Sequence, residues 1–466
     1  MTNAPIETDY LVVGAGQAGM AFTDSLLTHS DATITIVDRR HAPGGHWLDA
    51  YPFVRLHQAS AFYGVCSVPL GHDQRDTAGT NAGYYELAGV DEIRAYFAHV
   101  MHRHFLPTGR VRYFPSTEYV GDGRFVSRLT ENSGTVRVRR KIVDSTYLEG
   151  GIPATSPPPF EVADGVRWCP AGGIARVLER AERFVIIGAG KTALDACVWL
   201  LEQGVPASAI RWVKPRESWW VNRHFQQPYD LMPDTYRGVA IQLEAMAAAT
   251  SIEDMFLRLE AENYFLRIDP RLTPTMFRGA VLSEGELAKL RQIEDVVRLG
   301  RVRRITRDEI VLDQGRVPTN ARTVHVHCAA RGLSRPPLRP IFEPGRVTIQ
   351  PFRWGFVSFQ FSLLGLLEAT MPSDEEKNRL CPPTPYPSSI EDWPSLMRRT
   401  WVAEGRWLRE PDLAAWVAES RLNLLRALPQ HATEPSVQAA VSRYLAHVGA
   451  ATERLKQLDG SRGRAA

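Results

Sequence analysis

The clearest pattern of hydrophobic and polar positions lies near the start of the chain. Tyr10 to Val13 is apolar and rich in β-forming residues, which predicts a buried strand. Apolar residues from Met20 to Leu27 are spaced as on one face of a helix, and the apolar run Thr33 to Val37 predicts a second strand. Strand, helix and strand in this order indicate a βαβ unit with parallel strands.

A glycine-rich turn, Gly14-Ala15-Gly16-Gln17-Ala18-Gly19, joins the first strand to the helix. In this spacing the first glycine permits a tight turn, the second lets a pyrophosphate approach the backbone, and the third lets helix and strand pack closely. Asp38 ends the second strand, where a carboxylate binds ribose hydroxyls. The unit therefore predicts a dinucleotide site formed by Gly14, Gly16, Gln17, Ala18, Gly19, Asp38 and Arg39.

The same unit returns about 174 residues later. The apolar run Phe184 to Ile187 leads into Gly188-Ala189-Gly190-Lys191-Thr192-Ala193, followed by a predicted helix to about Gln203 and a strand from Ile210 to Val213. Alanine at the third glycine position is allowed by the fingerprint. A P-loop is excluded, because Val185 stands where that motif needs its first glycine. The second site is predicted to be formed by Gly188, Gly190, Lys191, Thr192 and Ala193.

The end of the second βαβ unit differs from the first, because it carries cations instead of an acid. Lys214 and Arg216 follow the strand. Cations pair with the 2′-phosphate of NADPH, whereas a carboxylate would repel it, so NADPH is favoured over NADH. The alternative is that both side chains are solvated surface cations.

The rest of the chain alternates between β-rich and helical stretches. We expect helices over 90–104, 239–248, 252–266 and 284–299, and strands over 110–113, 118–120, 124–129, 135–143, 301–305, 309–312 and 323–327. The Pro-rich segment 153–159 is predicted to be a linker. The last hundred residues are Pro-rich and then helical, and their four tryptophans are interpreted as a lid or a packing element.

Composition excludes several classes of function. A chain of 466 residues has room for two or three domains, and 44% hydrophobic and 23% charged residues are ordinary for a globular protein. The net charge of +3, without a basic patch, argues against nucleic-acid binding. Five scattered cysteines form no C-x-x-C pair, so no thioredoxin centre, zinc ribbon or other metal site is expected. No apolar run is long enough to span a membrane and no secretory signal is visible, so we expect a soluble cytoplasmic protein.

Together these motifs resemble the flavoproteins with two dinucleotide-binding domains, and most of all the class B monooxygenases of the flavin-containing and Baeyer–Villiger type. The resemblance covers residues 1–370 in organisation. No segment between Pro153 and Arg176 matches the family's F-x-G-x-x-x-H-x-x-x-W/Y sequence. The resemblance is carried by the two glycine turns with the residues that follow them, by Gly44-Gly45-x-Trp47, and by Ala329-Ala330-Arg331-Gly332, which stands where the family has an A-T-G turn against the flavin.

The resemblance implies roles for particular residues. Gly45, Trp47 and Gly332 would lie against FAD, and His57 and Gln58 stand where the family has an asparagine near the flavin. Gln58, His57 and Arg331 are the candidate catalytic residues. A structural role for His57 is equally compatible with the sequence. Arg223 and His224 are candidates to face the substrate, although we expect them at the surface.

The fold class expected from these observations is α/β, with two Rossmann-like dinucleotide-binding domains and a helical C-terminal extension. The FAD domain would comprise 1–180 and 318–385, the NADPH domain with a helical insertion 181–317, and the extension 386–466. The resemblance implies an FAD-dependent, NADPH-reduced monooxygenase that inserts one oxygen atom from O2 into a small organic substrate. The alternatives are an FAD-dependent NAD(P)H oxidase, dehydrogenase or reductase, and a flavin-containing sensor without turnover. The oligomeric state stays open.

Overall fold

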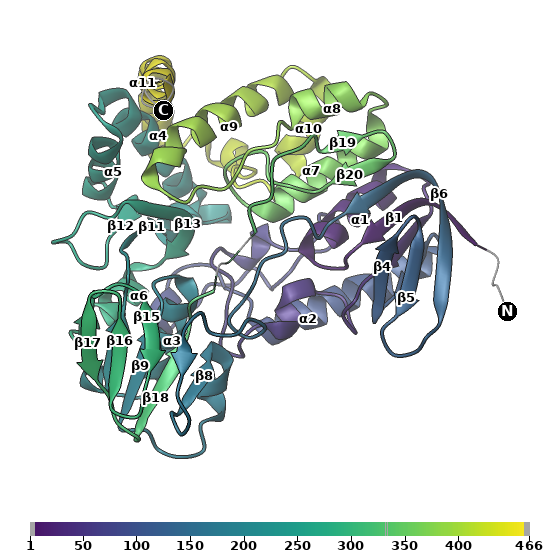
Figure 1. The fold of residues 1–466 in the computed structure, drawn as a ribbon. Coiled ribbons are helices and arrows are strands. Elements are labelled where there is room, and N and C mark those ends of the chain that lie inside the picture. Colours follow the sequence, from purple (N-terminus) through teal and green to yellow (C-terminus); the bar gives the residue numbers. More distant parts are fainter. Residues whose placement is uncertain (1–4, 331, 333, 461–466) are drawn as a thin grey trace.

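The computed structural model describes residues 5–330, 332 and 334–460. Two α/β units lie side by side, and helices from the middle and the end of the chain lie above both of them (Figure 1). This is the α/β class expected from the two repeated βαβ patterns. Between the units the chain crosses several times, so residues far apart in sequence share the space between the two sheets.

The first unit is built on a sheet whose central strands run in the order β19-β20-β6-β1-β2-β3. The central strand β1 is parallel to both β2 and β6, as the first βαβ pattern predicts. A hairpin, β4 and β5, extends from β6. The strands are β1 (Ile6–Val13), β2 (Ile34–Val37), β3 (Val111–Phe114), β4 (Thr117–Gly121), β5 (Arg124–Ser127), β6 (Ser133–Asp144), β19 (Phe342–Glu343) and β20 (Arg346–Thr348).

Helix α1 (Gln17–His29) is covered by a helix from late in the chain, α7 (Val357–Thr370). The two helices approach closely, because a Cβ on Gly365 would lie 2.4 Å from the carbonyl oxygen of Phe22. Nearly all of α7 is buried, so its sequence shows no polar face. The predicted helix from Val90 divides into α2 (Val90–His99) and a π-helical turn to Phe105.

The second unit contains a five-stranded parallel sheet in the order β14-β10-β9-β18-β8. Helix α3 (Lys191–Glu202) follows β9. Strands β8 and β18 lie in the sequence ranges expected for the FAD domain, but they pair in this second sheet. The sheet therefore does not follow the expected domain boundaries. The strands are β8 (Trp168–Pro170), β9 (Arg183–Ile187), β10 (Ile210–Val213), β14 (Val296–Val297) and β18 (Thr323–His327).

Two smaller sheets accompany this unit, one in the order β12-β11-β13 and one in the order β17-β16-β15-β7. Strand β11 is buried along its whole length, so it lacks the alternation that marks a half-buried strand, and the sequence did not predict it. The predicted helix 284–299 ends at Leu290. The strands are β7 (Glu161–Val162), β11 (Ser218–Asn222), β12 (Phe265–Leu266), β13 (Met276–Leu282), β15 (Val302–Ile305), β16 (Glu309–Leu312) and β17 (Gly315–Pro318), and the helices are α4 (Met232–Ala248), α5 (Ile252–Ala261) and α6 (Glu284–Leu290).

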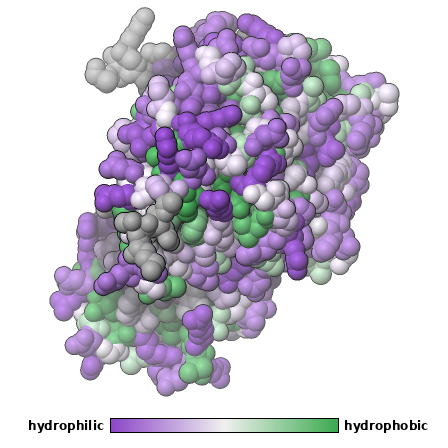
Figure 2. Space-filling view, turned by 90° about the vertical axis from the view of Figure 1, so that its right-hand side faces the viewer, coloured by the Kyte–Doolittle hydropathy of each residue, from purple (hydrophilic) through white to green (hydrophobic). Residues whose placement is uncertain are grey.

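The C-terminal segment joins the two units instead of standing apart from them. Helix α11 packs along α4, while Trp393 and Trp407 are buried in two different hydrophobic cores. These tryptophans therefore serve packing. Seen from the side, the molecule is largely hydrophilic, and the hydrophobic residues on this face gather toward its middle (Figure 2). The helices are α8 (Asp374–Leu380), α9 (Trp393–Trp407), α10 (Pro411–Glu419) and α11 (Pro435–Gly460).

Across the described residues, no helix combines the length and the apolar character needed to cross a membrane.

Candidate functional site

Three cavities meet at Gly332, between the two α/β units. The first cavity, of about 530 Å³, contains the first glycine turn, and the second, of about 590 Å³, contains the second turn. The third cavity, of about 620 Å³, is lined by His57 and Gln58. Leu148 borders the first and third cavities, and Ile152 borders the first and second. Two turns that are far apart in sequence thus open toward one point.

The first glycine turn has the geometry that its spacing predicts. Gly14 has φ of +102°, which favours glycine, and a Cβ on Gly19 would lie 2.1 Å from the carbonyl oxygen of Gly14. Gly16 lies close to the backbone of Gly45: a Cβ on Gly16 would lie 3.4 Å from the Cα of Gly45. Gly14, Gly16, Gln17, Ala18 and Gly45 line the first cavity, whereas Gly19 supports the turn from behind.

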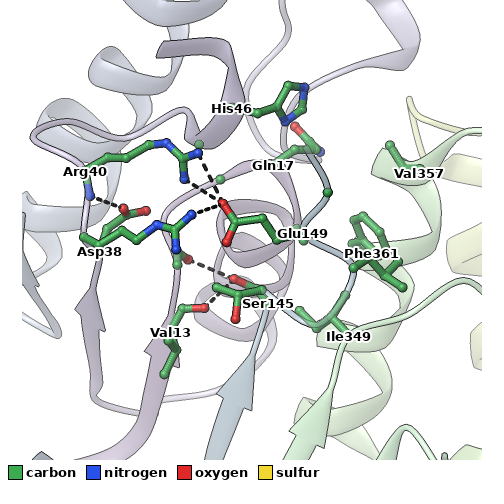
Figure 3. Close-up of a pocket in the computed structure, with 18 of the residues that line it drawn as sticks. Val13, Gln17, Asp38, Arg40, His46, Ser145, Glu149, Ile349, Val357 and Phe361 are labelled. Carbon is green, nitrogen blue, oxygen red and sulfur yellow. Dashed lines mark hydrogen bonds and ion pairs between the residues drawn. The ribbon is translucent and has the colours of Figure 1, made fainter. Parts of the chain in front are cut away.

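Asp38 lines the first cavity, but both of its carboxylate oxygens already hold backbone groups. They accept hydrogen bonds from the N–H of Ala15 at 2.5 Å and of Arg40 at 2.7 Å. Burial raises the pKa of Asp38. Beside it, Glu149 lies 2.5 Å from Arg39 and 3.2 Å from Arg40. Figure 3 shows the ion pair between Glu149 and Arg40. The sequence missed Glu149, because no motif connects it to the turn and it reaches this cavity only through the fold.

The opposite wall of the first cavity is apolar. Figure 3 shows Ile349, Val357 and Phe361 facing the side that carries Asp38 and Arg40. These three residues come from the segment after β20 and from α7, near the end of the predicted FAD domain. One side of this cavity is therefore polar and the opposite side is apolar.

Trp47 differs from its expected position against the flavin. Its side chain is 7% exposed and packs in the first hydrophobic core, behind the cavity wall. Its indole N–H donates a hydrogen bond of 2.6 Å to the hydroxyl of Tyr63, and Tyr63 lines the cavity. Trp47 therefore supports a wall residue and does not form the wall itself.

The segment that contains Tyr63 is fastened by Arg421, from the C-terminal segment. The Arg421 guanidinium donates to four carbonyl oxygens, at distances of 2.6 to 3.1 Å. Next to Tyr63, the Gly64 carbonyl accepts from Gln17 Nε2 at 2.9 Å, while the buried Gln17 Oε1 has no partner among the described residues. The four carbonyls that Arg421 holds belong to Ala61, Tyr63, Val65 and Val68.

The second glycine turn has one position that is open to a ligand. A Cβ on Gly188, which has φ of +144°, would lie 2.8 Å from the carbonyl oxygen of Cys328, so this glycine is required by close packing. A Cβ on Gly190 would meet no atom within 4 Å. Thr192 lines the second cavity, whereas Ala193 is fully buried beneath it. Gly190 is thus the point where the backbone is exposed to the cavity.

Lys191 was expected in the second cofactor site and does line the second cavity, but its ammonium is held by carboxylates. It lies 2.9 Å from Glu286 Oε1 and also pairs with Asp195, whose Oδ2 accepts a hydrogen bond of 2.6 Å from Tyr51. Burial opposes the charge on Glu286, but Lys191 and Arg223 outweigh it and hold the pKa of Glu286 well below its usual range. The ammonium of Lys191 is therefore part of a buried ion-pair cluster and is not free.

Arg223 completes this cluster, and its position differs from the surface placement expected from the sequence. Its side chain is 1% exposed, lies 2.8 Å from Glu286 Oε2, and donates to the carbonyl of His57 at 3.0 Å. Burial, together with the charges of Lys191 and Arg223, lowers the pKa of His57 to about 3. His224 lies near the surface beside Asp234, as expected. The ion-pair cluster therefore fixes the backbone at the third cavity and keeps His57 neutral.

The two cations after β10 have different positions. Lys214 is 2% exposed and pairs with Glu217 at 2.6 Å, and burial lowers its pKa, so this residue does not face the second cavity as predicted. Arg216 does line the second cavity, together with Arg278, Arg301 and Arg303. Of the two cations predicted from the sequence, Arg216 therefore lines the second cavity and Lys214 does not.

Three further predicted residues line the third cavity. His57 and Gln58 line the third cavity, and Gly332 lines all three. Arg331, the third candidate catalytic residue, lies outside the described residues.

Solved structures with a related fold include flavoproteins of the class that the sequence resembles. A flavin-containing monooxygenase from Stenotrophomonas maltophilia is 16% identical, with a TM-score of 0.40 over 75% of this chain and 87% of that chain. Cyclohexanone monooxygenase from Rhodococcus sp. Phi1 bound to NADP+ is 15% identical, with a TM-score of 0.41 over 69% and 70%. At TM-scores below 0.5, these similarities do not establish a cofactor or a substrate for this chain.

Sequence relatives are much closer. No protein-family model matches the chain. The uncharacterized protein Rv2000 of Mycobacterium tuberculosis (strain ATCC 25618 / H37Rv) is 44% identical over 456 residues, which is 97% of this chain and 84% of that protein. The uncharacterized protein Mb2023 of Mycobacterium bovis (strain ATCC BAA-935 / AF2122/97) has the same identity and coverage. Identity at this level over nearly the whole chain places the protein in one family with these mycobacterial proteins.

Proposed function

We propose that the protein is an FAD-dependent, NADPH-reduced monooxygenase that inserts one oxygen atom from O2 into a small organic substrate. The observation that carries the proposal is the meeting of three cavities at Gly332, two of which each contain a glycine turn at a helix N-terminus. Such turns present backbone N–H groups and a partial positive charge to a pyrophosphate. FAD and NADPH, when bound, would supply hydride transfer and the activation of O2.

The first cavity fits FAD. The N-terminus of α1 and Gly16 would hold the pyrophosphate, and Gln17 Oε1, which is buried without a partner among the described residues, is available to accept a hydrogen bond from a hydroxyl or a ring N–H group of FAD. Ile349, Val357 and Phe361 would exclude water from the apolar end.

The second cavity fits NADPH. The open backbone at Gly190 leaves room for a pyrophosphate, and Arg216 supplies the charge that distinguishes NADPH from NADH. No aspartate or glutamate occurs among the described residues that line this cavity. That absence favours a ligand with an additional phosphate.

The third cavity is the proposed substrate site. His57 is neutral at ordinary pH, because burial and the neighbouring cations lower its pKa, so its ring can donate or accept a hydrogen bond without carrying charge. Gln58 supplies an amide group beside it. The Arg223 contact to the His57 carbonyl holds the peptide group that joins these two residues, so their polar groups are fixed at the cavity wall.

We place the reaction in the cytoplasm. The five cysteines are unpaired in the described structure, which is typical of a reducing compartment.

The test is the absorption spectrum of the purified protein, followed by anaerobic addition of NADPH or NADH. The proposal expects a yellow protein that NADPH bleaches and that NADH bleaches at much higher concentration. In air, substrate should raise NADPH consumption without an equal release of hydrogen peroxide. Equal release in every condition would instead indicate the oxidase alternative, and a protein that cannot be loaded with FAD would refute the proposal.

A further inference from the structure

The third cavity has a concentration of positive charge that the proposed reaction does not use. Arg278 and Arg335 line it, and the described residues around it include no aspartate or glutamate. His57, which also lines it, is neutral at ordinary pH. The walls therefore carry two formal positive charges and no counter-charge.

An irregularity in β13 positions Arg278 at this cavity. Trp219 pairs with Phe277 and Val221 pairs with Val281, so four steps along β13 match only two along β11. The extra residues form a bulge that contains Arg278, which lines both the second and the third cavity. Bulges of this kind redirect side chains and are frequent beside active sites.

The guanidinium of Arg278 is charged without an opposing group. Within the described part of the chain, no carboxylate forms an ion pair with it. Burial lowers its pKa, and the charges of Arg335 and Arg216 lower it further. Arg335 donates one hydrogen bond of 3.0 Å to the carbonyl of Pro387, which leaves its other N–H groups available. An anion between Arg278 and Arg335 would relieve this repulsion.

The lining beside Arg278 includes an apolar ring that is packed against the bulge. Trp354 lies against the bulge, because a Cβ on Gly279 would stand 2.4 Å from its ring. The Trp354 ring is held in turn by Trp393 at 4.8 Å between ring centroids. The apolar lining consists of Trp354, Phe356, Val357, Tyr386 and Leu338.

We propose that the third cavity binds an organic carboxylate, with the carboxylate on Arg278 and Arg335 and the apolar body against Trp354. Guanidinium groups bind carboxylates through charge-assisted N–H···O hydrogen bonds, and Arg278 and Arg335 offer donors for both oxygens of one carboxylate. The volume of the third cavity, about 620 Å³, is in the range found for sites that bind small organic molecules. That this ligand is the substrate rests on the proposed function, whereas its binding does not.

The experiment measures binding by calorimetry on the FAD-loaded protein without NADPH. The probes are octanoate and 3-phenylpropanoate, each paired with its alcohol, octan-1-ol and 3-phenylpropan-1-ol. At least one carboxylate should bind more tightly than its alcohol. Arg278→Gln should weaken carboxylate binding at least about tenfold, as expected for loss of a charge-assisted contact, and leave alcohol binding unchanged. Arg278→Lys should retain part of the affinity, because the charge remains while the fork geometry is lost.

Controls separate this site from general charge effects and from the cofactor site. Arg124→Gln removes the same charge from an exposed position on β5, which lines none of the three cavities, and should change nothing. If neither carboxylate binds more tightly than its alcohol, or if Arg278→Gln weakens NADPH binding as much as carboxylate binding, the inference is overturned. Failure of the proposed function would appear separately, as a protein that binds carboxylates but is not reduced by NADPH.

Discussion

The most direct test of the second nucleotide site is Gly190→Ala. Gly190 caps the N-terminus of α3 with φ of −95°, which alanine adopts without strain, and the new methyl group would meet no protein atom within 4 Å. The protein should therefore fold normally. Replacing glycine at an N-cap costs at most about 1 kcal/mol, so Tm should fall by no more than a few degrees.

The effect on NADPH should be much larger than the effect on stability. The methyl group would stand in the second cavity, between the backbone N–H groups at the start of α3 and the phosphate oxygens that they would contact at about 2.9 Å. Losing one charge-assisted hydrogen bond costs about 1.5–3 kcal/mol, which corresponds to a roughly 10- to 150-fold weaker Kd.

The assay is an anaerobic titration of flavin reduction with NADPH, with FAD content measured by absorbance. Gly405→Ala is the matched control: this glycine lies in α9, its added Cβ also meets nothing, and the change should leave NADPH affinity unchanged. An unaltered NADPH affinity in a folded, FAD-loaded Gly190→Ala protein would refute the assignment of the second turn to the nucleotide.

Four further outcomes follow from the site. Arg216→Gln should weaken NADPH binding about tenfold or more while NADH binding changes little. Lys214→Ala should instead lower the free energy of unfolding by about 1–3 kcal/mol in a denaturant titration, because Glu217 loses one partner and keeps Arg298 as the other. The pKa of His57 is about 3 in the folded protein against 6.5 in the unfolded chain, so its contribution to the free energy of unfolding is full above pH 6.5. Below pH 6.5 that free energy should fall by about 1.4 kcal/mol per pH unit until the pH reaches about 3, because only the unfolded chain takes up the proton. His57→Gln should flatten this part of the stability profile, and an unchanged slope would contradict the burial argument. Arg421→Met should speed FAD dissociation, measured by fluorescence, because the segment that places Tyr63 in the first cavity wall loses the donor to four of its carbonyls. An unchanged dissociation rate would mean that the C-terminal segment does not organise that cavity.

The sequence by itself determined the two βαβ units and their turns. Local spacing was sufficient there, because Gly14 and Gly188 need positive φ and Gly19 needs close packing, and these requirements act within a few residues. The sequence did not predict strand β11, because this strand is buried on both faces and therefore lacks the alternation of apolar and polar residues that marks a half-buried strand.

Only the tertiary structure decided which charged residues are free. Lys191 and Lys214 have the right positions in sequence to bind phosphate, yet their partners Glu286 and Glu217 hold both ammonium groups in buried ion pairs. Arg216, two residues further along the chain, does line the second cavity. The physical reason is that the cost of burying a charge depends on partners contributed by other segments, and the sequence spacing of a motif does not specify them.

The meeting of the three cavities was likewise beyond the sequence. Glu149 reaches the first cavity from a loop, and Arg278 reaches the second and third from a strand bulge. Arg421, from the C-terminal segment, donates to the carbonyl of Tyr63, which lines the first cavity, and none of the three belongs to a motif. Long-range packing brings them to one place, because α7 must bury its apolar surface against α1 and the C-terminal helices must bury theirs against both units.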